Sequence, residues 1–422
     1  MPLVLGACAL KPPARTALQG DLPSLKRDIA SAQRAGKLDH GAVVDLARAL
    51  GEREVMSAQG SDGAERMRTL RGCARPLASV IERRAEADDD VAAELTLILL
   101  EQRGADRVAL MKRYANASNP GFRAVAARAA VRPVDSDVRR RFFTDPDERV
   151  RRAALAAARD AHQAEELDAL LEAARLDPDP QSQSLAAHAA GAIGGERAVL
   201  ALKDLWVQAD DQLRIAIVDG WAEKLSFTTG GQRELVAAAD AHAGLASVSA
   251  AYALVRMGSE FNASNARLRR SMLEGTDDEK RLALSVAPIN TENEAALLEV
   301  SKSASPELRV AALARLTSVP DQRSDAVHAL RGFANTQARS EADARARGAA
   351  LTALAETGDT TVEPTLVSGL SAKDRETRRR SAYGLTSLGA YSAAAPALAD
   401  DDVSLRTDLA CSILAREAIA RR

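Results

Sequence analysis

Aromatic residues are scarce in this chain and make up only 3% of its 422 residues. Alanine supplies much of the 46% hydrophobic share, as in the segment ALAAARDAHQAEELDALLEAARL at 154–176. Alanine is the strongest helix former and lets helices pack closely. Few stretches show the alternating, β-branched pattern of strands. The sequence therefore predicts an almost entirely helical protein.

Cysteine and histidine are also rare, which argues against metal and redox sites. The three cysteines Cys8, Cys73 and Cys411 form no C-x-x-C pair, and the five histidines lack metal-ligand spacing. We expect Cys73 and Cys411 to be small buried residues, and a disulfide between them remains an open alternative. The acidic runs at 88–90 and 400–402 lack the ligand pattern of a calcium loop, so we expect them to cap helices. We predict no metal, cofactor or catalytic residue.

Excess charge and long apolar runs are missing too. The net charge is −2, so no basic footprint predicts a nucleic-acid partner. No segment reaches the roughly 18 apolar residues of a membrane span. Phosphate loops and G-x-S-x-G elbows are also absent from the sequence.

Repetition is the most informative property of this sequence. The segment TDPDERVRRAALAAARD at 144–160 has counterparts roughly every 27 to 37 residues, a period typical of helical solenoids. Each unit is predicted to contain two helices, with a Pro/Asp turn before the second. We expect prolines near the start of second helices, caps before them and glycines after helices. These are Pro146, Pro180 and Pro306, then Asp145, Asp179 and Ser305, then Gly194, Gly258, Gly358 and Gly389.

The repeated units resemble HEAT repeats, in particular the short bacterial type of phycobilisome-lyase-like proteins. The resemblance runs from near Asp88 to Arg422, and its best unit has Asp145, Val150, Arg151 and Ala154 at family positions. It implies an all-α solenoid in which Asp and Arg form ladders between repeats. The arginine recurs as Arg214, Arg281 and Arg309, but Gln208, Gly275 and Ser303 replace the acid, so we expect a discontinuous ladder.

Three segments follow from this interpretation: a leader and tether at 1–13, capping hairpins at 14–86, and a HEAT-like solenoid at 87–422. The stretch LGAC, Leu5 to Cys8, resembles a bacterial lipobox, which implies a lipid on Cys8 and a location in the cell envelope. A lipoprotein leader needs a basic start and a longer apolar run, so we expect the start codon to lie upstream or the chain to be trimmed. The alternative is a chance match in a cytoplasmic protein.

Two groups of side chains are the candidates for partner binding. Arginine runs on a concave face would hold acidic segments or phosphates, although neighbouring acids would also pair with them. Trp206 and Trp221 flank one second helix, where core packing is the alternative role. The candidate arginines are Arg139, Arg140, Arg141, Arg151, Arg152, Arg378, Arg379 and Arg380.

The sequence thus predicts a non-catalytic scaffold that binds protein partners and reaches a membrane only through a lipid on Cys8. The alternative is a cytoplasmic HEAT-like enzyme or enzyme accessory. Chromophore lyases are one such class, and alkylpurine-DNA glycosylases, which use aromatics and an aspartate, are another. Asp219 beside Trp221 matches the latter pattern, while the near-zero net charge does not favour DNA binding.

Overall fold

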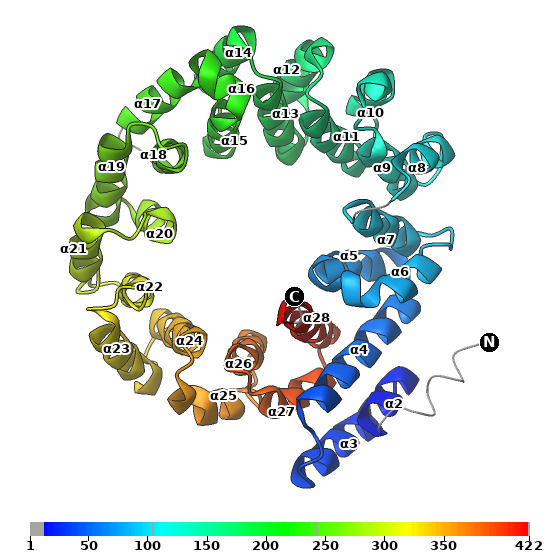
Figure 1. The fold of residues 1–422 in the computed structure, drawn as a ribbon, viewed down its shortest axis with the longest axis vertical. Helices are drawn as coiled ribbons and strands as arrows, with labels where there is room; N and C mark the ends of the chain where they lie inside the picture. The colour runs from blue at the N-terminus through cyan, green and yellow to red at the C-terminus, as the bar shows by residue number, and fades with distance from the viewer. Residues whose placement is uncertain (1–11, 103–104, 242–243, 421–422) are drawn as a thin grey trace. The chain divides into compact units, whose positions relative to one another are not determined.

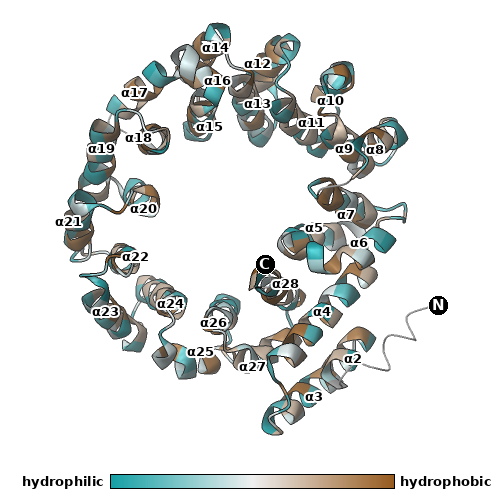
Figure 2. Cartoon of the chain, in the orientation of Figure 1, coloured by the Kyte–Doolittle hydropathy of each residue, from teal (hydrophilic) through white to brown (hydrophobic). Residues whose placement is uncertain are grey.

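The structure of the chain is a computed structural model, and it describes residues 12–102, 105–241 and 244–420. Every regular element among these residues is a helix, which confirms the predicted all-α class. Most helices in Figure 2 carry both apolar and polar residues, so each has a face to bury. None of the helices in the described ranges is long and apolar enough to cross a bilayer.

Contacts between helices divide the chain into two compact units. Unit 2 is the continuous segment Arg103–Arg323, whereas unit 1 combines Met1–Gln102 with Ser324–Arg422. The predicted capping segment 14–86 therefore belongs to the same unit as the last repeats. The predicted segment boundaries at 13 and 86 remain sequence-based.

Unit 2 consists of successive pairs of helices, in which each second helix packs against the second helix of the next pair (Figure 1). The first helices are α8 (Arg107–Tyr114), α10 (Ser136–Phe143), α12 (Leu167–Leu176), α14 (Glu196–Trp206), α17 (Gln232–Asp240), α19 (Phe261–Glu274) and α21 (Thr291–Val300). The second helices are α9 (Pro120–Ala129), α11 (Glu148–Ala161), α13 (Pro180–Ile193), α15 (Asp211–Ala222), α18 (Gly244–Arg256), α20 (Asp277–Val286) and α22 (Pro306–Leu316).

Several of these boundaries fall at predicted capping residues. Asp179 accepts a hydrogen bond from the Ser182 amide at the start of α13, and Ser305 plays the same role at α22. Gly194 ends α13 with a φ of 76°, a value that favours glycine. The prediction for Asp145 was wrong, because α11 begins two residues later than expected and its cap is Asp147.

A close approach of two backbones joins α13 to α15. A Cβ atom on Gly191 would lie 2.2 Å from Cα of Gly220, so position 191 does not tolerate a side chain without separating the helices. A Cβ atom on Gly220 would lie 3.1 Å from the carbonyl oxygen of Ala187, which requires a smaller shift. The small residues of these second helices therefore permit close packing, as the alanine-rich sequence predicts.

Unit 1 is assembled from both ends of the chain. Its N-terminal helices are α2 (Pro12–Gln19), α3 (Leu22–Arg34), α4 (His40–Ser57), α5 (Gly60–Thr69), α6 (Ala78–Arg84) and α7 (Asp90–Leu100). Its C-terminal helices are α23 (Arg323–Asn335), α24 (Glu341–Glu356), α25 (Glu363–Gly369), α26 (Arg375–Ser387), α27 (Tyr391–Ala394) and α28 (Val403–Ala420). Helix α5 contacts both α7 and α28, and α4 also packs on α28. The N-terminal helices thus cover the apolar face that the last helix would otherwise expose.

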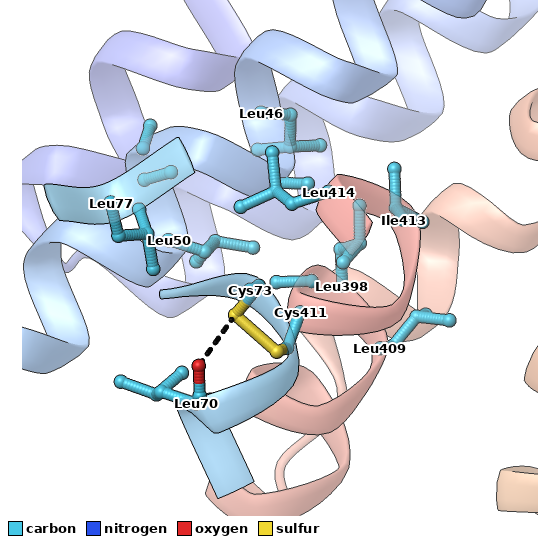
Figure 3. Close-up of a cluster of buried hydrophobic side chains, with 14 of the residues drawn as sticks. Leu46, Leu50, Leu70, Cys73, Leu77, Leu398, Leu409, Cys411, Ile413 and Leu414 are labelled. Atoms are coloured by element: carbon cyan, nitrogen blue, oxygen red, sulfur yellow. Dashed lines mark hydrogen bonds between the residues drawn. A yellow bond between two sulfur atoms is a disulfide. The ribbon is translucent and has the colours of Figure 1, made fainter. Parts of the chain in front are cut away.

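A disulfide fastens this arrangement. Cys73, in the 3-10 turn η1 (Leu70–Cys73), is bonded to Cys411 of α28, and the two residues are 338 positions apart in sequence. Both are buried, as predicted, among leucines from the two ends of the chain (Figure 3). The alternative that the sequence left open, a disulfide between these two cysteines, is present in the structure.

Candidate partner-binding surface

Arg139, the first of the predicted binding arginines, has no exposed surface in α10. Its guanidinium lies 2.6 Å from Oε1 of Glu166, which is equally buried. It also donates to the carbonyl oxygens of Ala130 and Arg132, both at 2.8 Å. Arg139 therefore joins α10 to the start of the next first helix and offers no surface to a partner.

Arg151 forms a rung between consecutive repeats. Its Nε and Nη2 atoms donate to the two carboxylate oxygens of Asp177 at 2.8 and 2.9 Å. Its Nη1 atom donates to the carbonyl of Asp145 at 2.9 Å, at the turn before its own helix. The hydrogen bonds to Asp177 raise the pKa of Arg151. This bidentate, largely buried pair holds the two turns in register.

The same rung occurs at two other places. Arg123 donates to Asp145 at 2.9 and 3.0 Å, and Arg378 donates to Asp400 at 2.8 and 3.4 Å. Each arginine also donates to two backbone carbonyls five and six residues before it. In all three rungs the acid comes from the following repeat.

A spacing in the sequence marks these rungs, although Arg123 and Asp177 were not among the predicted site residues. The arginine is the fourth residue of its second helix in α9, α11 and α26. The acid is the first residue of an Asp-x-Asp triplet, whose second aspartate caps the next second helix. The triplets are 145–147, 177–179 and 400–402.

The ladder is interrupted after α13, as the sequence predicts. Gln183 takes the arginine position there and donates only to the carbonyl of Asp177. In the next repeat Arg214 donates to the carbonyl of Trp206 and lies 4.0 Å from Asp211 of its own helix. Two rungs therefore belong to unit 2 and one belongs to unit 1.

The other candidate arginines all contact acceptor groups of the chain itself. Arg152 donates two hydrogen bonds to the carboxylate of Asp179, both at 2.7 Å. These bonds hold the pKa of Asp179 well below its ordinary value. A role of these arginines in partner binding remains a prediction. The further pairs are Arg140 with Asp137, Arg141 with the carbonyl of Ala115, Arg379 with Asp408 and Arg380 with Glu376.

The two tryptophans lie together, with ring centroids 5.3 Å apart. Trp221 is 2% exposed and its indole N–H donates to the carbonyl of Val199, so it is part of the core. Trp206 is half-buried, and the guanidinium of Arg214 lies 5.6 Å from its ring centroid. Only Trp206 retains surface for a partner.

A cluster of polar groups on α13, α15 and α18 is the best candidate surface in unit 2. We call His188, Asp219, Glu223, Tyr252 and Arg256 the second-helix cluster. His188 Nε2 lies 2.8 Å from Oε1 of Glu223, and the Arg256 guanidinium lies 5.9 Å from the Tyr252 ring centroid. Asp219 is exposed and forms no hydrogen bond within the described part of the chain.

Electrostatics set Asp219 apart from the paired acids. Desolvation by the surrounding helices raises its pKa, and Glu223 adds to this effect, while His188 and Arg256 oppose it. A crowded carboxylate without a donor is an acceptor site for an incoming N–H group. The second-helix cluster therefore offers hydrogen-bonding capacity that the fold itself does not use.

Unit 1 contains hollows between its helices. A cavity of about 460 Å³ lies between α3 and the last repeats and is lined by Lys26, Arg378, Asp400 and Asp401. Its charges are already paired, Lys26 with Asp401 at 2.7 Å and Arg378 with Asp400. A second hollow of about 730 Å³ is lined by residues of α2, α3 and α4.

The remaining predictions concern the acidic runs at 88–90 and 400–402, metal sites and Cys8. The acidic runs cap helices as expected: Asp89 accepts from the Ala92 amide at α7, and Asp402 accepts from Ser404 at α28. No group of histidine, cysteine or acidic residues in the described ranges has a geometry suited to a metal ion. Cys8 lies outside the described residues.

A comparison with protein families supports the repeat assignment. The family model for HEAT repeats matches residues 136–220 and 335–415, one stretch in each unit. A crystal structure of a Kap121p mutant covers 93% of this chain at 12% identity with a TM-score of 0.34, and this chain spans 47% of it. An engineered protein covers 96% of this chain, with 99% of its own length matched, at 15% identity and a TM-score of 0.23. These scores are too low to transfer an arrangement or a function. No curated protein matches the chain.

Proposed function

We propose that this HEAT-repeat protein is a non-catalytic scaffold for protein partners, anchored in the bacterial cell envelope by a lipid on Cys8. HEAT repeats in general mediate protein binding, and the two matched stretches support the first part. The observation that carries the binding role is the second-helix cluster, where the exposed carboxylate of Asp219 lacks a donor. The partner would supply that donor from an extended segment lying across α13, α15 and α18.

The binding role is tested by selecting peptides from a random display library against the purified protein. Selected peptides should bind Asp219→Asn about tenfold more weakly, because a neutral amide oxygen replaces the charged acceptor of the hydrogen bond. Asp211→Asn is the matched control, because Asp211 is an exposed aspartate on the same helix and outside the cluster. Peptides that bind Asp219→Asn as tightly as the unmodified protein would place the binding surface elsewhere.

Two observations support the envelope location. The LGAC stretch resembles a lipobox, and the disulfide between Cys73 and Cys411 is of a kind that persists in oxidising compartments and is rare in the cytosol. The two supports are independent, because one concerns Cys8 and the other concerns the two remaining cysteines.

Lipidation is tested by expressing the gene with its upstream in-frame codons in a bacterial host. We expect the protein to gain the mass of a diacylglyceryl group and to enter the detergent phase, and Cys8→Ala to do neither. If both proteins stay aqueous and unmodified, the lipobox resemblance is accidental and the cytoplasmic alternative gains support.

The alternative function is a HEAT-like enzyme or enzyme accessory, of the chromophore-lyase or alkylpurine-glycosylase class. The observation that favours it is the raised pKa of Asp219 near His188, since such groups also serve in acid–base chemistry. Titration of Trp206 fluorescence with a bilin or with alkylated DNA separates the two functions. A saturable change at low concentration would favour the enzyme class.

A further inference from the structure

In unit 1, helices from the two ends of the chain meet and pack against each other. We call this contact the seam: residues 12–102 on one side and residues 324–420 on the other. On the first side α4 and η1 contribute, and on the second side α28 and the 3-10 turn η7 (Ala395–Ala399) contribute. Leucines from both sides, including Leu46, Leu50, Leu409 and Leu414, form one buried cluster.

The polar contacts across the seam are mostly exposed, and they include a hydrogen bond from Gln33 to the carbonyl of Ser392 at 3.0 Å. Lys26 lies 2.7 Å from Asp401, and the side chains of these residues are 46% and 82% exposed. His40 Nε2 lies 2.8 Å from Oε2 of Glu417, and its ring meets that of Tyr391 edge-on at 4.7 Å. Exposed pairs of this kind contribute little to stability. The seam therefore depends on its apolar cluster and on the disulfide.

The disulfide lies inside the closed seam. Cys73 is completely buried and Cys411 is 6% exposed, and both belong to the apolar cluster of the seam (Figure 3). Thiol–disulfide exchange needs a thiolate to approach one of the sulfur atoms directly. An oxidant or reductant therefore reaches these sulfurs only while α28 is displaced from η1.

We propose that Cys73 and Cys411 form a redox-operated latch that fixes α28 to the N-terminal helices. A partner that carries a disulfide closes the latch by thiol–disulfide exchange, and a dithiol or thiol opens it. The oxidised chain holds the seam shut. The reduced chain samples an open state in which α28 is displaced from α4 and η1. The inference does not depend on lipidation of Cys8.

Closing the latch consumes one disulfide of the exchange partner. One protein thiolate attacks the partner disulfide, which forms a mixed disulfide and releases one partner thiolate. The second protein thiolate attacks the protein sulfur of that mixed disulfide, forms the Cys73–Cys411 bond and expels the second partner thiolate. Two electrons and two protons pass from the protein to the partner, which becomes a dithiol or two thiols.

Chain connectivity explains why the covalent bond matters. The two cysteines are 338 positions apart, so without the disulfide the two sides of the seam are joined covalently only through the whole intervening chain. The disulfide keeps α28 and η1 adjacent during every local opening. The seam is thus the part of unit 1 whose local stability depends most on redox state.

Hydrogen exchange of the complete protein, in glutathione buffers of defined redox ratio, tests the latch. Mass spectrometry first establishes that the reduced sample has gained two hydrogens and that its thiols react with iodoacetamide. On reduction we expect amides of α28 and η1 to exchange about tenfold faster or more, as expected for local opening. Helices α11 and α13 of unit 2 are the internal control and should keep their exchange rates.

Variants make the result independent of reductant. Cys73→Ala with Cys411→Ala should reproduce the reduced pattern in every buffer, whereas Cys8→Ala should behave like the unmodified protein. Addition of oxidised glutathione to the reduced protein should restore protection of α28. The proposal is overturned if α28 exchanges equally in both redox states, or if the disulfide yields to glutathione only in denaturant.

Discussion

Units 1 and 2 are built from the same kind of helix pair. The contacts within each unit, however, join residues at very different separations in the sequence. In unit 2, Arg123 and Arg151 reach acids 22 and 26 residues away. In unit 1, Lys26 contacts Asp401 across 375 residues, and the disulfide spans 338. Contacts between residues close in sequence close small loops at low entropic cost. Contacts between residues far apart in sequence can form only after both ends of the chain have been brought together. We therefore expect unit 2 to form from neighbouring repeats alone and unit 1 to be completed last.

The difference also assigns the two units different roles. Unit 2 has charged rungs that satisfy their own donors and acceptors, and its exposed Asp219 has no donor within the described residues and a pKa raised by desolvation. Unit 1 has a shared apolar cluster and a covalent bond. Partner binding is accordingly proposed for unit 2, and control of closure is proposed for unit 1.

Ala154→Asp should have the largest effect and should be confined to unit 2. Ala154 is completely buried in α11, and an aspartate there needs both space and a partner for its carboxyl group. We expect a loss of about 5 kcal/mol in unfolding free energy, which combines overpacking with burial of an unpaired polar group. Chemical denaturation gives the magnitude, with exposed Ala164→Asp as the control. Equal loss of exchange protection in unit 1 would break the division between the units.

Removal of the disulfide should act mainly on unit 1. We expect Cys73→Ala with Cys411→Ala to lower the unfolding free energy of unit 1 by about 4 kcal/mol, because the cross-link spans a very long loop. Hydrogen exchange under increasing denaturant measures each unit separately. A matching loss in unit 2 would mean that the seam also stabilises the continuous repeats.

Much of the local structure was predictable from the sequence because it depends on neighbouring residues. Helical periodicity, the cap Asp179 and the stop Gly194 each act within one turn of the chain. The misplaced cap at Asp145 shows the limit of that reasoning. In the Asp-x-Asp triplet at 145–147, the first aspartate pairs with Arg123 of the previous repeat and the second caps the helix.

The candidate site was less predictable, because exposure is a property of packing. Arg139 and Arg140 are neighbours in sequence, yet one is completely buried against Glu166 and the other is exposed. Which of the two arginines is buried depends on which one faces the first helix of the following pair. The seam was also out of reach, since no local pattern relates Cys73 to Cys411 across most of the chain.

Breaking the buried ion pair Arg139–Glu166 should be the next largest effect. We expect Arg139→Met to cost about 3 kcal/mol of unfolding free energy, because Glu166 then remains buried without a counter-charge. The double variant Arg139→Met with Glu166→Leu should recover most of that loss. Denaturation of the three proteins measures the recovery. If the double variant is as unstable as the single one, packing of the guanidinium, not its charge, stabilises this contact.

The smallest predicted effect concerns the pH dependence of the pair Arg152–Asp179. Arg152 lowers the pKa of Asp179 from the ordinary 3.8, so the carboxylate stabilises unit 2 above that pH and loses its contribution as pH falls toward the folded value. Asp179→Asn keeps the helix cap but not the charge. We expect it to cost about 1 kcal/mol at pH 7 and progressively less below pH 4.

Asp211→Asn is the control, because the Asp211 carboxylate lies 4.0 Å from Arg214 and its replacement should show no comparable pH dependence. A loss for Asp179→Asn that is the same at pH 3 and pH 7 would show that the pair Arg152–Asp179 acts through shape and not through charge.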